Sequence, residues 1–77
     1  MRHDGYYIIA KELVDTMHGY AIGHNKYNDA APYAVFDIHA VNGVLVFSRP
    51  NYYVTETSAR LAYYGSLLDD WSYRASA

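Results

Sequence analysis

The sequence predicts an α+β fold: a small antiparallel β-meander of three to four strands, with one C-terminal helix packed on one face. Three observations predict it. An Asn42-Gly43 pair stands between two strand-like runs, apolar residues recur at helical spacing in the last third, and 77 residues suffice for one core only. We therefore expect residues 1–77 to form a single α+β domain.

A hairpin is the most sharply defined of the expected elements. Two strand-like runs, Tyr33–Val41 and Val44–Arg49, flank the Asn-Gly pair, which favours a two-residue type I′ turn because both central residues need positive φ. This turn sets Ile38 opposite Phe47. Since side chains alternate across a strand, one face of the hairpin is apolar and is expected to form the core: Phe36, Ile38, Ala40, Leu45 and Phe47. The opposite face is mixed in character and is expected to be exposed or partly covered.

The C-terminal third predicts a helix. Thr55 or Thr57 is suited to the N-cap position, and Glu56 suits the positive end of the helix dipole. Four apolar residues follow at i, i+3, i+7 and i+10, which places them on one helical face: Leu61, Tyr64, Leu68 and Trp71. We expect this face to lie on the apolar face of the hairpin. Gly65, inside the helix, would permit a close approach of helix and sheet.

Residues 6–17 fit two elements. Tyr6, Ala10, Leu13, Val14 and Met17 fall at helical spacing, whereas Tyr6–Leu13 is also rich in the Tyr and Ile residues of a strand. The strand is preferred, because the strand-like piece Tyr20–His24 needs a neighbour and an adjacent hairpin arm is the simplest one. The expected order of elements is then β-β-β-β-α.

Composition and charge exclude several classes of protein. Six Lys and Arg stand against eight Asp and Glu, for a formal net charge of −2, and no basic patch is visible, so nucleic acid is not the expected partner. No apolar run is long enough to span a membrane, and the polar N-terminus lacks the form of a signal peptide. The bacterial cytoplasm is the expected location. A domain this small is commonly stabilised by a partner subunit, and without cysteine it has no disulfide, so either a homodimer or a docked partner protein is expected.

No catalytic, metal or cofactor site is expected. The histidines lack the short spacing of zinc ligands: His3, His18, His24 and His39. Asp37, His39 and Ser48 share one strand face, but they lie on an open sheet with no implied pocket, which is not the arrangement of a hydrolase. Asp69 and Asp70 are neighbours on a helix and do not face each other, so they are expected to be solvated. The sequence thus predicts a protein that is not an enzyme.

Tyrosine supplies the main functional indication. The chain has ten, including the adjacent pairs Tyr6-Tyr7, Tyr52-Tyr53 and Tyr63-Tyr64. A fold this small cannot bury all of them, so one ring of each pair is expected inside and the other outside. Tyr, Trp and Arg are enriched in interface hot spots. The candidate protein-binding patch is Tyr52, Tyr53, Tyr63, Arg60, Trp71 and Arg74.

The layout over residues 6–70 resembles small accessory proteins of bacteriophages and other mobile elements. The similar segments are Lys11-Glu12, Gly19–Asn25, Pro32-Tyr33, Asn42-Gly43 and Tyr52-Tyr53. The chain departs from the pattern where Asp37-Ile38-His39 and Phe47-Ser48-Arg49 replace Trp-rich segments. The resemblance implies a protein that binds and blocks a host factor, as anti-CRISPR proteins do, and it implies no catalytic residues.

The sequence therefore predicts a non-enzymatic protein-binding module, an inhibitor or modulator that occludes a surface of a host protein such as a defence complex. Two alternatives stay open: binding of single-stranded RNA or DNA by stacking on surface tyrosines, and a structural subunit of a larger assembly. The first alternative needs basic residues beside exposed tyrosines, so it depends on the positions of Lys11, Arg49, Arg60 and Arg74.

Overall fold

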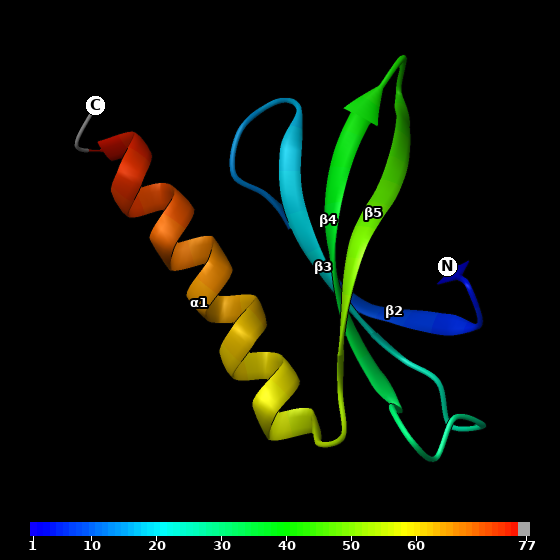
Figure 1. The fold of residues 1–77 in the computed structure, drawn as a ribbon. Coiled ribbons are helices and arrows are strands. Elements are labelled where there is room, and N and C mark those ends of the chain that lie inside the picture. Colours follow the sequence, from blue (N-terminus) through cyan, green and yellow to red (C-terminus); the bar gives the residue numbers. More distant parts are fainter. Residues whose placement is uncertain (76–77) are drawn as a thin grey trace.

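The structure, a computed structural model, describes residues 1–75 and shows a five-stranded antiparallel sheet with one helix along one face (Figure 1). The strands lie in the sheet in sequence order, so the expected meander and the α+β fold are confirmed. The elements are β1 (Arg2–His3), β2 (Tyr6–Leu13), β3 (His18–His24), β4 (Tyr33–Val41), β5 (Val44–Tyr53) and α1 (Glu56–Ala75). The short β1 is one strand more than the four expected.

The β4–β5 hairpin has the expected turn and register. Asn42 and Gly43 both have positive φ, 50° and 78°, as a type I′ turn requires. Ile38 pairs with Phe47, and the ladder continues without a break from the turn to the pair of Asp37 and Ser48. Beyond that point a bulge shifts the register, and β5 runs on to Tyr53 rather than ending at Arg49.

The N-terminal third is a hairpin of two strands, which confirms the strand over Tyr6–Leu13 and excludes the helix. β3 begins at His18, two residues before its expected start at Tyr20. The Asp15 carboxylate explains the earlier start, because its Oδ1 accepts the backbone N–H groups of Met17, at 2.7 Å, and His18, at 2.6 Å. These bonds form a tight turn that returns the chain directly into β3.

The sheet is twisted so strongly that it carries an apolar cluster on each face. On the face away from α1, β2 packs against the apolar face of β4 and β5 (Figure 1). This first cluster consists of Tyr6, Ile8, Ala21, Ala34, Phe36 and Ile38, with Leu45 and Phe47 against it. The second cluster lies under α1 and consists of Ile22, Val35, Ala59, Tyr63 and Leu67. The expected contact between the helix and the Phe36 face is therefore wrong, because the N-terminal strands cover that face.

The face of α1 that packs on the sheet also differs from the expected one. Ala59, Tyr63 and Leu67, at i, i+4 and i+8, are buried. The four residues expected in the core are exposed instead: Leu61, Tyr64, Leu68 and Trp71. Gly65 does not serve a close approach either, since a Cβ at this position would meet no atom within 4 Å. Periodicity identified an apolar face correctly, but α1 has two such faces and the sheet covers the other one.

The start of α1 follows the capping rules. Thr55 precedes the first helical residue, and its Oγ1 accepts the backbone N–H of Ser58 at 3.2 Å. Thr55 is thus the N-cap, in agreement with one of the two expected positions. Glu56 follows in the first turn, where a carboxylate suits the helix dipole.

Candidate protein-binding surface

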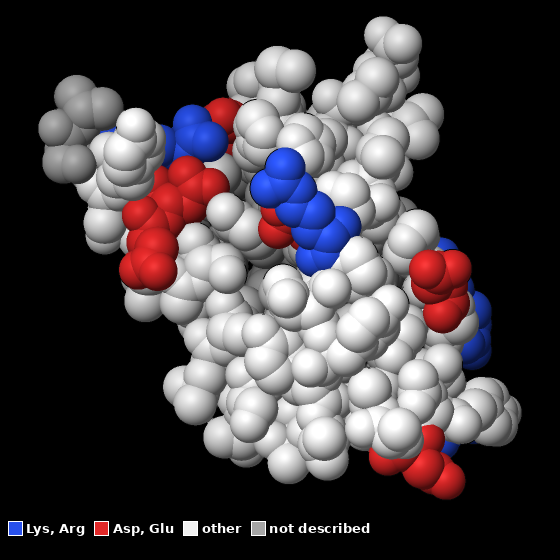
Figure 2. Space-filling view, in the orientation of Figure 1, with Lys and Arg blue, Asp and Glu red and all other residues white. Residues whose placement is uncertain are grey.

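One exposed arc of α1 is apolar and uncharged, whereas the exposed side of a surface helix normally carries charge. We call its four large residues the α1 stripe; their exposed fractions are 70% for Leu61, 48% for Tyr64, 60% for Leu68 and 41% for Trp71. At about 100° per residue, the arc from Trp71 to Gly65 that contains the stripe holds no charged residue. In Figure 2 the middle and lower surface of α1 is accordingly white, and charged atoms gather toward its C-terminal end.

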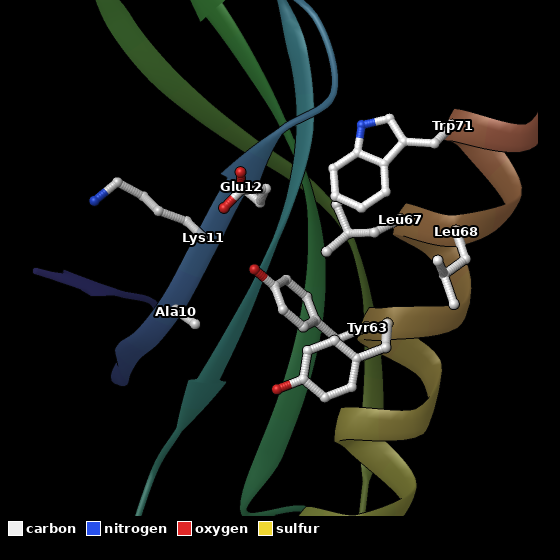
Figure 3. A pocket seen from close by; sticks show the side chains of 8 residues that line it. Ala10, Lys11, Glu12, Tyr63, Leu67, Leu68 and Trp71 are labelled. Carbon is white, nitrogen blue, oxygen red and sulfur yellow. The ribbon is translucent and has the colours of Figure 1, made fainter. Parts of the chain in front are cut away.

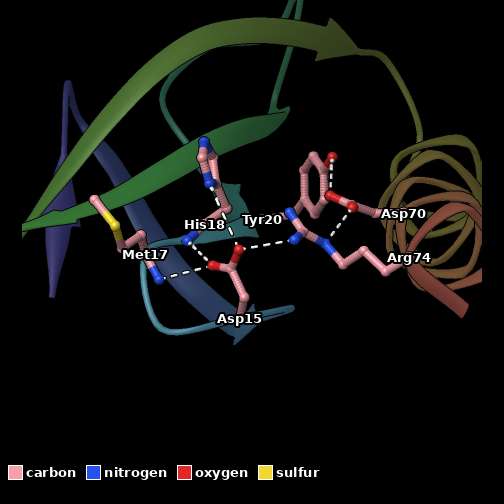
Figure 4. Close-up of polar contacts among 6 residues, drawn as sticks. All are labelled: Asp15, Met17, His18, Tyr20, Asp70 and Arg74. Atoms are coloured by element: carbon pink, nitrogen blue, oxygen red, sulfur yellow. Dashed lines mark hydrogen bonds and ion pairs between the residues drawn. The ribbon is translucent and has the colours of Figure 1, made fainter. Parts of the chain in front are cut away.

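Two charged residues near the C-terminus of α1, Asp70 and Arg74, point toward the sheet and are held there (Figure 4). The Tyr20 hydroxyl donates to Asp70 at 3.0 Å, and Arg74 Nε donates to the same carboxylate at 2.7 Å. Arg74 Nη1 also lies 2.8 Å from Asp15 Oδ2. This chain of contacts ties the end of α1 to the β2–β3 turn. The expectation that Asp70 is simply solvated is therefore wrong.

These contacts shift the pKa values of two of the groups that they join, Tyr20 and Asp15. Burial, followed by the hydrogen bond to Asp70, raises the pKa of Tyr20 to about 12. Backbone N–H donors from Met17 and His18, with a smaller contribution from Arg74, lower the pKa of Asp15 below its usual value. Tyr20 is therefore protonated and Asp15 ionised at neutral pH, which is the combination that the contacts require.

The first turn of α1 is anchored in the same way. Glu56 accepts a hydrogen bond from Arg60 Nε at 2.7 Å and one from the Tyr33 hydroxyl at 3.3 Å. The hydrogen bond from Arg60 lowers the pKa of Glu56 below its usual value. Polar contacts thus join both ends of α1 to the sheet, through Glu56 at its start and through Asp70 and Arg74 at its end. Arg60 also has a side-chain hydrogen bond with Tyr64 of the stripe.

A groove of about 520 Å³ runs between the stripe and β2 (Figure 3). One wall consists of Ala10, Lys11 and Glu12 of β2, and the other is formed by α1, including Tyr64, Leu68 and Trp71 of the stripe. In Figure 3 the Trp71 ring extends from the helix toward β2, and the buried Tyr63 lies farther along the same helix. The site therefore combines an apolar wall with one charged rim, the usual composition of a protein-binding surface.

The structure distributes the six candidate residues over different surroundings. Trp71 lies on the stripe, Tyr63 is buried beneath it with 4% exposed, and Tyr53 packs beside the helix cluster. Tyr52 is on the opposite face, where its ring centre is 6.1 Å from that of Tyr6. The remaining two, Arg60 and Arg74, are held in ion pairs. The six therefore form no single patch.

Two of the three tyrosine pairs follow the expected rule of one ring inside and one outside, whereas in the third Tyr52 is exposed and Tyr53 is only partly buried. Tyr6 is 4% exposed against 53% for Tyr7, and Tyr63 is 4% exposed against 48% for Tyr64. Sequence reasoning nevertheless missed Leu61, Tyr64 and Leu68 as surface residues because it assigned them to the core. No sequence signal identifies them as exposed, because an apolar arc without charge, opposite an arc with charged residues, is the pattern of a face that packs on the core.

Within the described part of the chain, the four histidines, and the Asp37, His39 and Ser48 group, do not assemble into a metal-binding site. The rings of His18 and His39 lie 4.3 Å apart, whereas His3 stacks on Phe47 and His24 stacks on Tyr33. Among residues 1–75 no three His, Asp or Glu side chains gather in a metal-binding arrangement. Asp37 and Ser48 face each other across the ladder.

Comparison of the chain with protein-family models, with curated proteins and with solved structures finds no match. Over the described residues 1–75, no helix combines the length and the apolar character needed to cross a membrane. Function is therefore argued from the surface itself.

Proposed function

We propose that this chain is a non-enzymatic protein-binding module that docks through the α1 stripe. The observation that carries the proposal is the α1 stripe: four large residues are exposed on an arc of α1 that holds no charged residue, while Asp70 and Arg74 are bonded toward the sheet. A helix whose outer face meets only water normally carries charge there. An apolar helical face beside a groove is instead the form in which helices dock on protein partners.

The chemistry of the stripe indicates what the partner presents. Tyr64 and Trp71 are large amphipathic anchors of the kind that dominate interface energetics, and Leu61 and Leu68 add aliphatic surface between them. A matching partner presents an apolar, uncharged face. Lys11 and Glu12 lie at the opposite rim of the groove, where a polar group of the partner is accommodated without being buried.

The finer proposal is that the partner is a larger host protein whose surface the module occludes, in the cytoplasm of a bacterial cell, as expected of a mobile-element modulator. The ion pairs favour a protein over a nucleic acid as the partner. Arg60 and Arg74 are both paired with carboxylates, so neither is an unpaired cation for phosphate, although Arg60 lies beside the exposed Tyr64. Lys11 lies at the rim of the groove, and one lysine does not form the basic patch that a nucleic acid needs.

Affinity capture from bacterial lysate tests the proposal. Wild-type protein is compared, after nuclease treatment, with a variant that carries Leu61→Glu and Leu68→Glu on the stripe. Val54→Glu is the matched control, because Val54 is 68% exposed and lies outside α1. We expect one protein to be retained in stoichiometric amount by the wild type and the control, and its recovery to fall at least about tenfold in the double variant, as for loss of a hot spot.

Unchanged far-UV circular dichroism in all three proteins shows that the fold is intact. Two results would contradict the proposal: recovery that disappears with nuclease, and recovery that the double variant retains in full.

A further inference from the structure

The two edges of the sheet differ in how they are protected against pairing with another strand. At the first edge, β1 covers β2 only at Tyr6 and Tyr7. Farther along β2 a bulge between Ile8 and Ala10 breaks the register, and Lys11 and Glu12 add charge. Bulges and edge lysines are devices that prevent edge-to-edge association. Along β5, the segment Val44–Ser48 has no bulge, no proline and no charged residue, and no strand follows it in the sheet order among residues 1–75.

We propose that this unprotected segment of β5 pairs with the same segment of a second copy of the chain, antiparallel and about a two-fold axis at Val46. A symmetric pairing of this kind brings the same surface of each copy together. It would join the two sheets into one continuous sheet across the dimer.

The free N–H and C=O groups of β5 lie at the residues where this pairing needs them. Val41 and Val44 flank the two-residue turn and form the first pair of the ladder, so Val44 bonds toward β4 and the direction then alternates along the strand. Leu45 and Phe47 therefore direct their N–H and C=O groups outward. With the axis at Val46, Leu45 of one copy meets Phe47 of the other, and each such pair exchanges two backbone hydrogen bonds.

The side chains are equally self-complementary. Leu45 and Phe47 of the two copies form aliphatic–aromatic pairs on one face, and the two Val46 side chains meet on the other, at the closest type of cross-strand position. Val44 and Val46 are 63% and 46% exposed in the single chain. The pairing covers apolar surface that is otherwise left in water.

Arg49 and Pro50 end the segment that is able to pair, and this limits the registers open to the dimer. Arg49 has a φ of 49°, outside the range of a regular strand, and Pro50 has no N–H to donate. Pairing is thereby confined to Val44–Ser48. His3 stacks on the ring of Phe47 from within the sheet's own cluster, and this contact is on a face of the strand rather than along its edge.

The β5 dimer leaves the α1 stripe available. The groove beside the stripe is lined by β2, which β3 and β4 separate from β5 in the sheet. A dimer formed through β5 thus presents two stripes, and a partner with two binding sites gains avidity from this arrangement.

Sedimentation and light scattering over a concentration series test the proposal with purified protein. The wild type is expected to approach the mass of a dimer as concentration rises. Val46→Lys and Val46→Glu are each expected to stay monomeric, because like charges meet directly at the axis. An equimolar mixture of the two is expected to recover the dimer, since opposite charges then face each other.

Two controls separate this interface from others. Val41→Lys adds the same charge to an exposed β4 position, 50% exposed, away from the edge, and should dimerise as the wild type does. The stripe variant with Leu61→Glu and Leu68→Glu should also dimerise. A wild type that is monomeric throughout, a dimeric Val46→Lys, a mixture that stays monomeric, or a monomeric control would each overturn the proposal.

Discussion

Replacement of Phe36 by alanine is expected to lower the free energy of unfolding by about 3–5 kcal/mol, the usual effect of removing a buried aromatic ring. Phe36 is 1% exposed and lies at the centre of the first cluster, where its ring contacts those of His3, Tyr6 and Phe47 edge to face. Its removal leaves a cavity between β2 and β4 that the paired strands cannot close by local adjustment.

A domain of this size has only marginal stability, so Phe36→Ala is expected to be largely unfolded at room temperature. Urea denaturation followed by circular dichroism measures the loss. Tyr27→Ala is the control, because Tyr27 is 80% exposed and its removal should change the free energy of unfolding by no more than about 0.5 kcal/mol. Equal stability of the two variants would show that the first cluster is not the core.

The second large effect concerns two adjacent leucines of α1. Leu67→Ala is expected to destabilise the fold by about 2–5 kcal/mol, because Leu67 is 4% exposed and packs in the cluster under the helix. Leu68→Ala is expected to change stability by no more than about 0.5 kcal/mol, because Leu68 is 60% exposed.

The pair is matched in residue type, substitution and helical position, so the difference between the two midpoints of denaturation reports only which face is buried. If Leu68→Ala proved the more destabilising of the two, the helix would pack through the stripe and the surface described here would be internal.

Much of the fold was predictable because its signals are local. The Asn42-Gly43 turn sets the register of β4 and β5 through the φ values of two residues. The strand over Tyr6–Leu13 was predictable because the strand-like piece Tyr20–His24 needs a second strand to pair with. Thr55 as N-cap likewise depends on one side chain and one backbone N–H.

The helix face was not predictable from periodicity alone. Leu61, Tyr64, Leu68 and Trp71 form a stronger apolar pattern than Ala59, Tyr63 and Leu67, yet the sheet selects the second set. Long-range contacts decide the choice: Asp70 bonds to Tyr20 and Arg74 to Asp15, and each pair is at least 50 residues apart in the chain. No local rule anticipates such pairs.

The candidate site shares this limitation. Sequence reasoning placed Trp71 on a binding patch and also in the core-facing stripe, and only the three-dimensional arrangement separates the two roles. The general expectation of exposed tyrosines was confirmed by Tyr7, Tyr52 and Tyr64. Which face of the molecule each of them lies on depends on the twist of the sheet and was not predictable.

Fluorescence of Trp71 tests the central claim most directly, because it is the only tryptophan in the chain and lies on the stripe with 41% of its surface exposed. In dilute, folded, purified protein we expect an emission maximum toward the red. We also expect acrylamide to quench the emission about as efficiently as it does in the unfolded chain. A blue-shifted emission that resists quenching until the protein unfolds would contradict it, since the stripe would then be part of the core.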